Sequence, residues 1–142
     1  GSVLFTERLW RRDGCFMPPD PGTPADWLRH ARSDLSLARK TGDPDTLLET
    51  LCFHAQQATE KCFKAILVSR GIPPPATHNL KTLVEKFPPD LGVPADVADA
   101  IALTDYAVTT RYPGVYEEVG EDEYRDALRM AERVMAWVER VT

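Results

Sequence analysis

The sequence predicts an all-α fold, an antiparallel up-and-down bundle of four long helices plus one short helix. Apolar residues recur every three or four positions in several long stretches, which is the spacing of one face of an α-helix. Proline and glycine clusters separate these stretches, and no stretch alternates apolar and polar residues as a β-strand would. Short connections between long helices favour antiparallel neighbours, so we expect a bundle.

The chain divides into an arm and one helical domain. Residues 1–22 form the N-terminal arm, in which residues 1–2 resemble a tag remnant and a proline cluster at 18–21 marks a linker. The arm is rich in apolar residues, so we expect it to pack on the domain or on a neighbouring subunit. Residues 23–142 form the bundle, and a chain of 142 residues is long enough to bury a core of ordinary size.

The first helix is predicted to begin at Thr23 and Pro24. Thr23 with Asp26 three residues later is a capping-box pattern, in which each side chain bonds to the backbone amide of the other residue. The helix ends at residues 40–42, where a glycine breaks the pattern. Its apolar stripe consists of Trp27, Ala31, Leu35 and Ala38.

The central helix is predicted over residues 45–70, because neither glycine nor proline interrupts that run. Asp43 is placed to cap its start, Pro44 suits its first position, and Gly71 ends it. Apolar residues lie on two opposite faces, so we expect burial on two sides, against its own bundle and against something else. A polar seam runs between these faces and consists of His54, Gln57, Lys61 and Lys64.

Three further helices follow the central one. A short helix opens at residues 77–79, where a hydroxyl or amide side chain can cap it. Another runs from Pro94 to about Thr110, so that Arg111 lies at its C-terminal end. The last begins at Glu121, the first of three acidic residues that stabilise the positive end of the helix dipole.

The composition excludes several kinds of site. A net charge of −5 leaves no sequence-wide basic surface for nucleic acid, so any RNA contact must be local. Three cysteines cannot all pair, and no histidine or cysteine spacing fits a metal site, so we expect reduced structural thiols, no metal and no cofactor. No apolar run reaches the ~20 residues of a membrane span and no signal peptide is visible, so we expect a cytoplasmic protein without a membrane segment.

Three segments occur in a characteristic order along the chain. Residues 53–58 read Phe-His-Ala-Gln-Gln-Ala, residues 77–80 read Thr-His-Asn-Leu, and residues 106–108 read Tyr-Ala-Val shortly before Arg111. Together they resemble the HEPN domain, named for higher eukaryotes and prokaryotes nucleotide-binding, over residues 24–141. The resemblance implies a helical bundle that is usually a homodimer. It also implies a small nucleotidyltransferase as partner, in a toxin–antitoxin-like setting.

The resemblance bears on catalysis as well. Many HEPN proteins are metal-independent endoribonucleases whose motif is an Arg, four to six further residues and a His. Arg111 matches the Arg, but Tyr116 stands where the His is expected. A phenol, with a pKa of about 10, is a poor base at neutral pH, whereas an imidazole can take or give a proton. The incomplete motif favours a module without RNase activity; the alternative is an endoribonuclease in which Tyr116 or His54 acts with Arg111.

The expected ligand site combines two parts of the chain. The resemblance places Arg111 and Tyr112 near the dimer axis, and the seam of the central helix adds His54, Gln57 and Lys61. Their positive charge and N–H donors favour an anion, such as a phosphate or a nucleotide. The alternatives are a His54 that is hydrogen-bonded within the bundle, an Arg111 that only caps a helix end, and a purely structural interaction module without a ligand.

Overall fold

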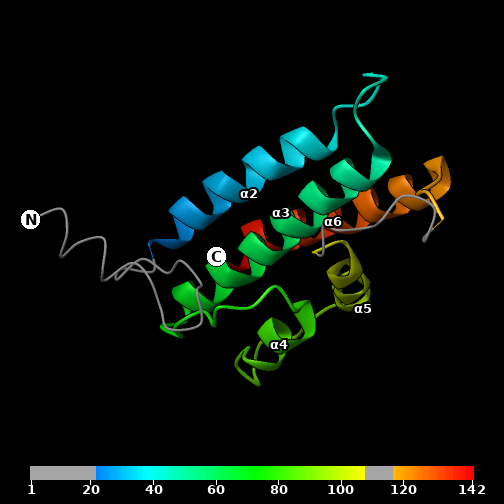
Figure 1. Cartoon of the computed structure of the whole chain (residues 1–142). Coiled ribbons are helices and arrows are strands. Elements are labelled where there is room, and N and C mark those ends of the chain that lie inside the picture. The colour runs from blue at the N-terminus through cyan, green and yellow to red at the C-terminus, as the bar shows by residue number, and fades with distance from the viewer. Residues whose placement is uncertain (1–21, 108–116) are drawn as a thin grey trace, which may run out of the picture.

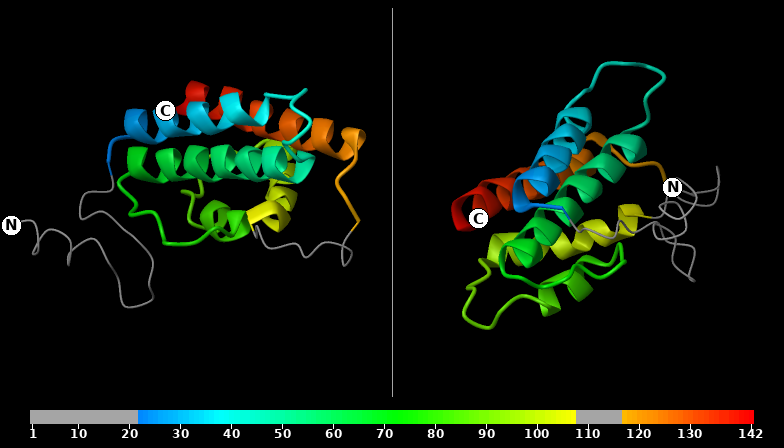
Figure 2. Two further views of the ribbon diagram at one scale, coloured as in Figure 1. Left: turned by 45° about the horizontal axis from the view of Figure 1, so that its top comes forward. Right: turned by 90° about the vertical axis from the view of Figure 1, so that its left-hand side faces the viewer.

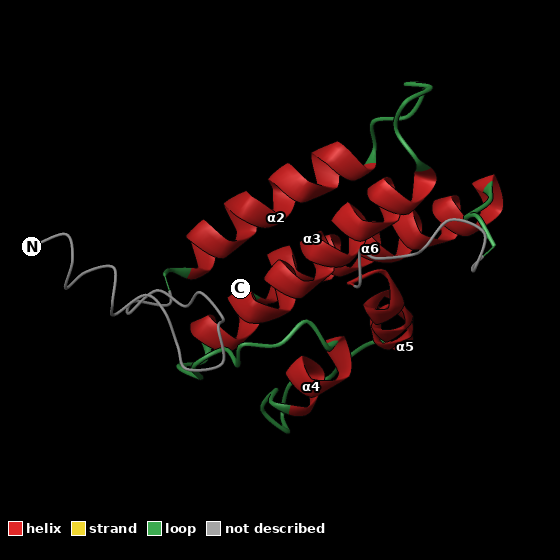
Figure 3. Ribbon diagram, in the orientation of Figure 1, coloured by secondary structure: helices red, strands yellow, loops and turns green. Residues whose placement is uncertain are grey.

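The computed structural model describes residues 22–107 and 117–142. In this part of the chain every regular element is a helix, as the sequence predicts (Figures 1 and 3). The elements are α2 (Pro24–Ala38), α3 (Leu48–Ser69), α4 (Leu80–Glu85), α5 (Ala95–Ala98), a 3₁₀ helix η1 (Asp99–Ala107) and α6 (Glu121–Val141). The arm over residues 1–21 lies outside the described residues, as does the segment 108–116.

Helices α2 and α3 form an antiparallel hairpin. The ring of Trp27, in the first turn of α2, lies 5.7 Å from the ammonium of Lys64 near the end of α3. Asp34, farther along α2, meets His54 in the first half of α3. Helix α6 also runs antiparallel to α2, because Arg32 pairs with Glu139 and Arg39 pairs with Glu132.

Helix α3 occupies the centre of the domain. Figure 2 shows α2 and α6 on one side of α3, and α4 with the α5–η1 segment on the other. Phe63 and Leu67, which lie on the second apolar face of α3, are fully buried. The ring of Phe63 packs edge-on against Phe87, just after α4, at 5.5 Å. The expected burial on two sides is confirmed, but the second face is covered by α4 and the α5–η1 segment of the same chain and not by something outside the bundle.

The helix ends follow the predicted caps with one exception. Thr23 and Asp26 form both bonds of the capping box, at 3.1 and 3.2 Å. Gly71 ends α3 with a φ of 73°, and the amide of Ile72 donates to the carbonyl of Leu67, which is a Schellman termination. Asn79 caps α4 by accepting from two backbone amides.

The start of α3 differs from the prediction. The helix begins at Leu48 and its N-cap residue, Leu47, provides no side-chain hydrogen bond. The Asp43 carboxylate instead accepts a hydrogen bond from the amide of Asp45 at 2.9 Å, which forms a local Asx turn. The predicted cap at Asp43 and first position at Pro44 are therefore wrong, because the carboxylate is engaged within its own turn.

The helix predicted from Pro94 onward is shorter and tighter than expected. Four residues are α-helical, and the next nine form the 3₁₀ helix η1. Its predicted end near Thr110 lies outside the described residues. Within residues 22–107 and 117–142, no helix combines the length and apolar character that a membrane span requires.

Candidate functional site

One stripe of the central helix stays partly open. Between Leu51 and Leu67 of α3 every side chain is buried except four that are half-buried. These four lie on consecutive turns and consist of Phe53, His54, Gln57 and Lys61. The stripe contains three of the four polar seam residues predicted from the sequence, and the fourth, Lys64, is buried.

Asp34 of α2 joins two residues of this stripe. Its Oδ1 lies 3.0 Å from His54 Nδ1, and its Oδ2 accepts a hydrogen bond from the Lys61 ammonium. The Asp34 side chain is 12% exposed, and those of His54 and Lys61 are 25% and 24% exposed. The structure therefore brings together two predicted site residues around a carboxylate, and one of the two ring nitrogens of His54 is hydrogen-bonded within the bundle.

The tautomer of His54 follows from its partner. A carboxylate paired with an ammonium has acceptor oxygens only, so His54 Nδ1 must carry the proton and donate it. In the neutral ring the other nitrogen, Nε2, is then an acceptor. Such a ring, fixed by a carboxylate at Nδ1, has the arrangement used by general bases and by hydrogen-bonding ligand sites.

A second carboxylate, Glu60, holds a separate cluster. It accepts from Gln56 Nε2 at 3.3 Å and meets His78 Nδ1 at 2.8 Å, both on Oε1. Its other oxygen pairs with Lys64 at 3.1 Å, and the side chains of Glu60 and Lys64 are 5% and 8% exposed. Gln56 also donates to the backbone carbonyl of His78 at 3.2 Å. The cluster thus fastens the proline-rich segment before α4 to the central helix.

Gln57 belongs to the second cluster. Its amide donates to Gln56 Oε1 at 2.7 Å, and Gln56 in turn bonds to Glu60. The seam predicted as one site is therefore divided, with His54 and Lys61 on Asp34 and the other two residues on the network of Glu60.

The remaining predicted site residues are Arg111, Tyr112 and Tyr116. All three lie in the segment 108–116, outside the described residues. Their roles stay predictions.

Sequence reasoning missed the residues that organise both clusters. Asp34 interrupts the apolar stripe of α2, three residues after Ala31 and four before Ala38, and an acid in such a position needs a buried partner. Glu60 stands four residues before Lys64, which is the spacing of a helical ion pair. Both signals are visible in the sequence, but neither identifies the histidine that joins each pair.

The buried cysteines offer no alternative chemistry. Cys52 and Cys62 are both reduced thiols within the buried core. Burial raises the pKa of the Cys62 thiol to about 12, so the group stays neutral, and it packs 3.9 Å from the sulfur of Met135. Within the described ranges, no group of three or more histidine, cysteine, aspartate or glutamate side chains could hold a metal ion.

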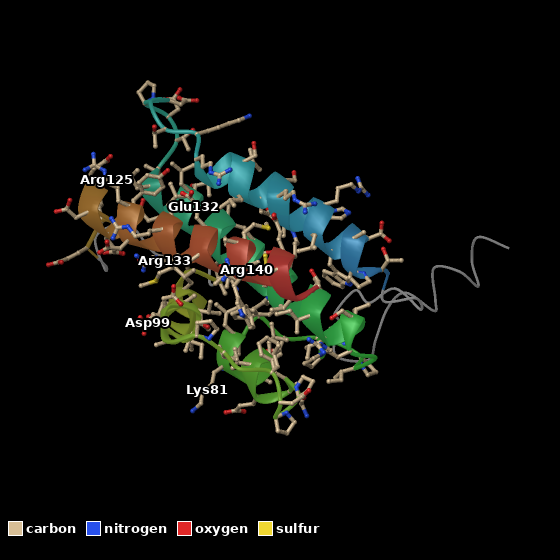
Figure 4. The ribbon with its side chains drawn as sticks, turned by 180° about the vertical axis from the view of Figure 1, so that it is seen from behind. Lys81, Asp99, Arg125, Glu132, Arg133 and Arg140 are labelled. Atoms are coloured by element: carbon tan, nitrogen blue, oxygen red, sulfur yellow. The ribbon has the colours of Figure 1, made fainter. Side chains whose placement is uncertain are left out.

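The face of the molecule opposite the one seen in Figure 1 carries both acidic and basic side chains. Figure 4 shows Arg125, Arg133 and Arg140 on α6, with Glu132 on the same helix and Asp99 nearby on η1. Arg125 pairs with Glu121 at 3.4 Å. Because acids and bases alternate here, this surface has the character of a solvated helix face.

Comparison with known proteins identifies the fold. TT1696 from Thermus thermophilus is 30% identical with a TM-score of 0.69, covering 82% of this chain and 96% of that one. ST0689, described as an archaeal HEPN homologue, is 28% identical with a TM-score of 0.63, covering 83% of this chain and 96% of that one. No curated protein matches the chain. The family model of the HEPN domain matches residues 24–141, which is nearly the whole bundle. The chain therefore belongs to the HEPN domain family.

Proposed function

We propose that this HEPN protein is a homodimer that binds a nucleotide, or the phosphate of an RNA or partner, at the open stripe of α3. The observation that supports the proposal is the meeting of His54 and Lys61 on Asp34, at the part of α3 that stays accessible. Association with a small nucleotidyltransferase in a toxin–antitoxin-like setting is part of the same proposal, and it rests on family membership.

Lys61 keeps binding capacity in this arrangement. An ammonium has three N–H donors, and Asp34 accepts one of them. The side chain is 24% exposed, so the remaining donors can reach a ligand. Lys61 is therefore suited to hydrogen-bond a phosphate oxygen while its position is fixed by the carboxylate behind it.

Binding an anion at this pair requires a second cation besides Lys61. Asp34 offsets the charge of Lys61, so this pair alone attracts an anion weakly. Arg111 is our candidate for the second cation, because an arginine can hold a phosphate through two parallel hydrogen bonds. In this proposal Arg111 and Tyr112 contribute to binding the anion.

Calorimetric titration with adenosine monophosphate tests the binding proposal. Lys61→Met should lower the affinity about tenfold or more, because it removes a charge-assisted hydrogen bond. Lys81→Met is the matched control, since Lys81 lies on α4 with a side chain 70% exposed, and it should leave the affinity unchanged. A wild-type protein that binds no nucleotide and captures no nucleotidyltransferase would contradict the proposal.

The dimer is tested by light scattering. A homodimer should show twice the chain mass of 15.9 kDa at micromolar concentration. A particle of the single-chain mass under these conditions would rule the dimer out.

A second candidate function is a metal-independent endoribonuclease. The Asp34–His54 pair favours it, because a histidine fixed by a carboxylate can serve as the base that the family motif lacks in this chain. Arg111 would stabilise the negative charge at phosphorus, and Tyr116 is the other candidate for proton transfer. RNA cleavage by the wild type that is lost in Arg111→Ala and in His54→Gln would support this function. Equal background cleavage by all three proteins would end it.

A further inference from the structure

The second ring nitrogen of His54 is the feature that carries this inference. Among residues 22–107 and 117–142 the ring has its hydrogen bond at Nδ1, to Asp34. No buried side-chain nitrogen or oxygen in these ranges lacks a hydrogen-bond partner. Nε2 has no partner there, so it must be accessible, which agrees with the 25% exposure of the side chain. An acceptor lone pair therefore points out of the described structure.

Its neighbours narrow the kind of ligand that fits. Lys61 pairs with the opposite oxygen of the same carboxylate and keeps further N–H donors, so one carboxylate holds both the donor group and the ring that carries the acceptor. Phe53 is half-buried and its ring packs edge-on against the His54 ring, with 5.4 Å between the centroids, which adds an apolar surface beside the imidazole. A matching ligand has an anionic oxygen for Lys61, a hydroxyl donor for Nε2 and a flat or apolar part for Phe53.

We infer that His54 Nε2 accepts a hydrogen bond from the 2′-hydroxyl of a ribose, so that the site prefers ribonucleotides to deoxyribonucleotides. This inference rests on the proposed function and specifies the part of the nucleotide that the site recognises. A ribonucleotide joins a phosphate, a hydroxylated sugar and a flat base in one small molecule. The 2′-hydroxyl is the group by which proteins distinguish RNA from DNA, and an acceptor at fixed position can read it. Asp34 acts as a positioning residue, because it holds the proton on Nδ1.

Three ligands separate the contributions of the sugar. Adenosine monophosphate, its 2′-deoxy analogue and its 3′-deoxy analogue should be titrated into the wild-type protein by calorimetry. Loss of one accepted hydrogen bond predicts a roughly three- to tenfold weaker Kd for the 2′-deoxy analogue, whereas the 3′-deoxy analogue should bind as adenosine monophosphate does. Weaker binding of the 3′-deoxy analogue alone would contradict the inference, because a deoxyribonucleotide keeps its 3′-hydroxyl. Equal affinity for all three would overturn the inference while leaving nucleotide binding in place, whereas no binding of any of them would remove the proposed function and the inference together.

Two variants test the role of His54 itself. His54→Phe keeps an aromatic ring but removes the acceptor, so it should bring the three affinities within twofold of one another. Lys61→Met should lower the affinity for all three ligands by the same factor, because Lys61 contacts the phosphate that the three ligands share. A His54→Phe protein that keeps the ribose preference would contradict the inference.

A measurement on the wild-type protein avoids any folding defect of a variant. Nitrogen-15 NMR of the imidazole distinguishes a protonated Nδ1 from a protonated Nε2. The inference requires the proton on Nδ1 in the neutral ring and a change of the Nε2 signal when adenosine monophosphate binds. A neutral ring with its proton on Nε2 would overturn it.

Discussion

Two clusters beside the central helix use the same residue types for different purposes. Each contains one carboxylate, one lysine and one histidine, centred on Asp34 in the first cluster and on Glu60 in the second. In the first cluster all three side chains are between 12% and 25% exposed. In the second the carboxylate and the lysine are 5% and 8% exposed, and the histidine is 69% exposed. The difference lies in which members water and ligands can reach.

The Asp34 cluster has the features of a ligand site. The Glu60 cluster is a structural clamp, because it fastens the segment before α4 to the central helix. Glu60 accepts hydrogen bonds from three side chains, one of them on the segment before α4, so this carboxylate is saturated by the protein itself. Asp34 also has its two partners, but His54 keeps an accessible Nε2 and Lys61 keeps further N–H donors. A ligand can therefore add to the first cluster without breaking it. In the second cluster Lys64 is only 8% exposed, so a ligand that reaches the exposed His78 finds no accessible ammonium donor beside it.

The largest expected effect is on the clamp. Glu60→Gln leaves the buried Lys64 ammonium without an opposite charge, so we expect the free energy of unfolding to fall by about 3–5 kcal/mol. Urea denaturation measures this change. Glu85→Gln is the matched control, because the Glu85 side chain is 61% exposed in its pair with Lys81 and should matter little. A loss below ~1 kcal/mol in Glu60→Gln, the size of one ordinary hydrogen bond, would show that the cluster is not a clamp.

A smaller loss is expected at the open cluster. Asp34→Asn weakens the hydrogen bonds to His54 and Lys61, but both partners can turn to water, so we expect a loss of about 1–2 kcal/mol. The same urea experiment applies, with the exposed Asp90→Asn as control. Asp34→Asn should also abolish the ribose preference, since an amide can donate to Nδ1 and move the ring proton to Nε2. If it destabilises the protein as much as Glu60→Gln does, the proposed contrast between the clusters is wrong.

The smallest effect is expected at His78. Its side chain is 69% exposed although Nδ1 meets Glu60, so His78→Ala should cost less than about 1 kcal/mol. Lys64 and Gln56 continue to satisfy Glu60 in this variant. Thermal unfolding can be compared with that of His30→Ala, whose side chain is exposed on α2. A loss of several kcal/mol would place His78 among the essential members of the clamp.

Local signals in the sequence predicted most of the fold. The capping box at Thr23, the glycine stop at Gly71 and the cap at Asn79 all form as expected, because each depends on residues within a few positions. The start of α3 could not be placed in this way. The Asp43 side chain can either cap a helix or bond within its own turn, and in the structure it bonds to the amide of Asp45. The 3₁₀ geometry of η1 has no clear signature in its apolar spacing.

The candidate site was only half predictable. Helical spacing placed His54 and Lys61 on one stripe, because a periodic pattern fixes which residues share a face. It could not show that Asp34 of α2 would join them, since that contact depends on how two helices pack. For the same reason helical spacing groups Gln57 and Lys64 with His54, although their partners lie on the network of Glu60.

The most direct test follows the chain's three histidines, His30, His54 and His78, by NMR during titration with adenosine monophosphate. One lies in the open cluster, one in the clamp and one on an exposed part of α2, so each reports on a different region. The account predicts that the imidazole signals of His54 shift and saturate with the calorimetric binding curve, while those of His78 and His30 stay in place. Binding that moves the signals of His78 and leaves those of His54 unchanged would contradict it.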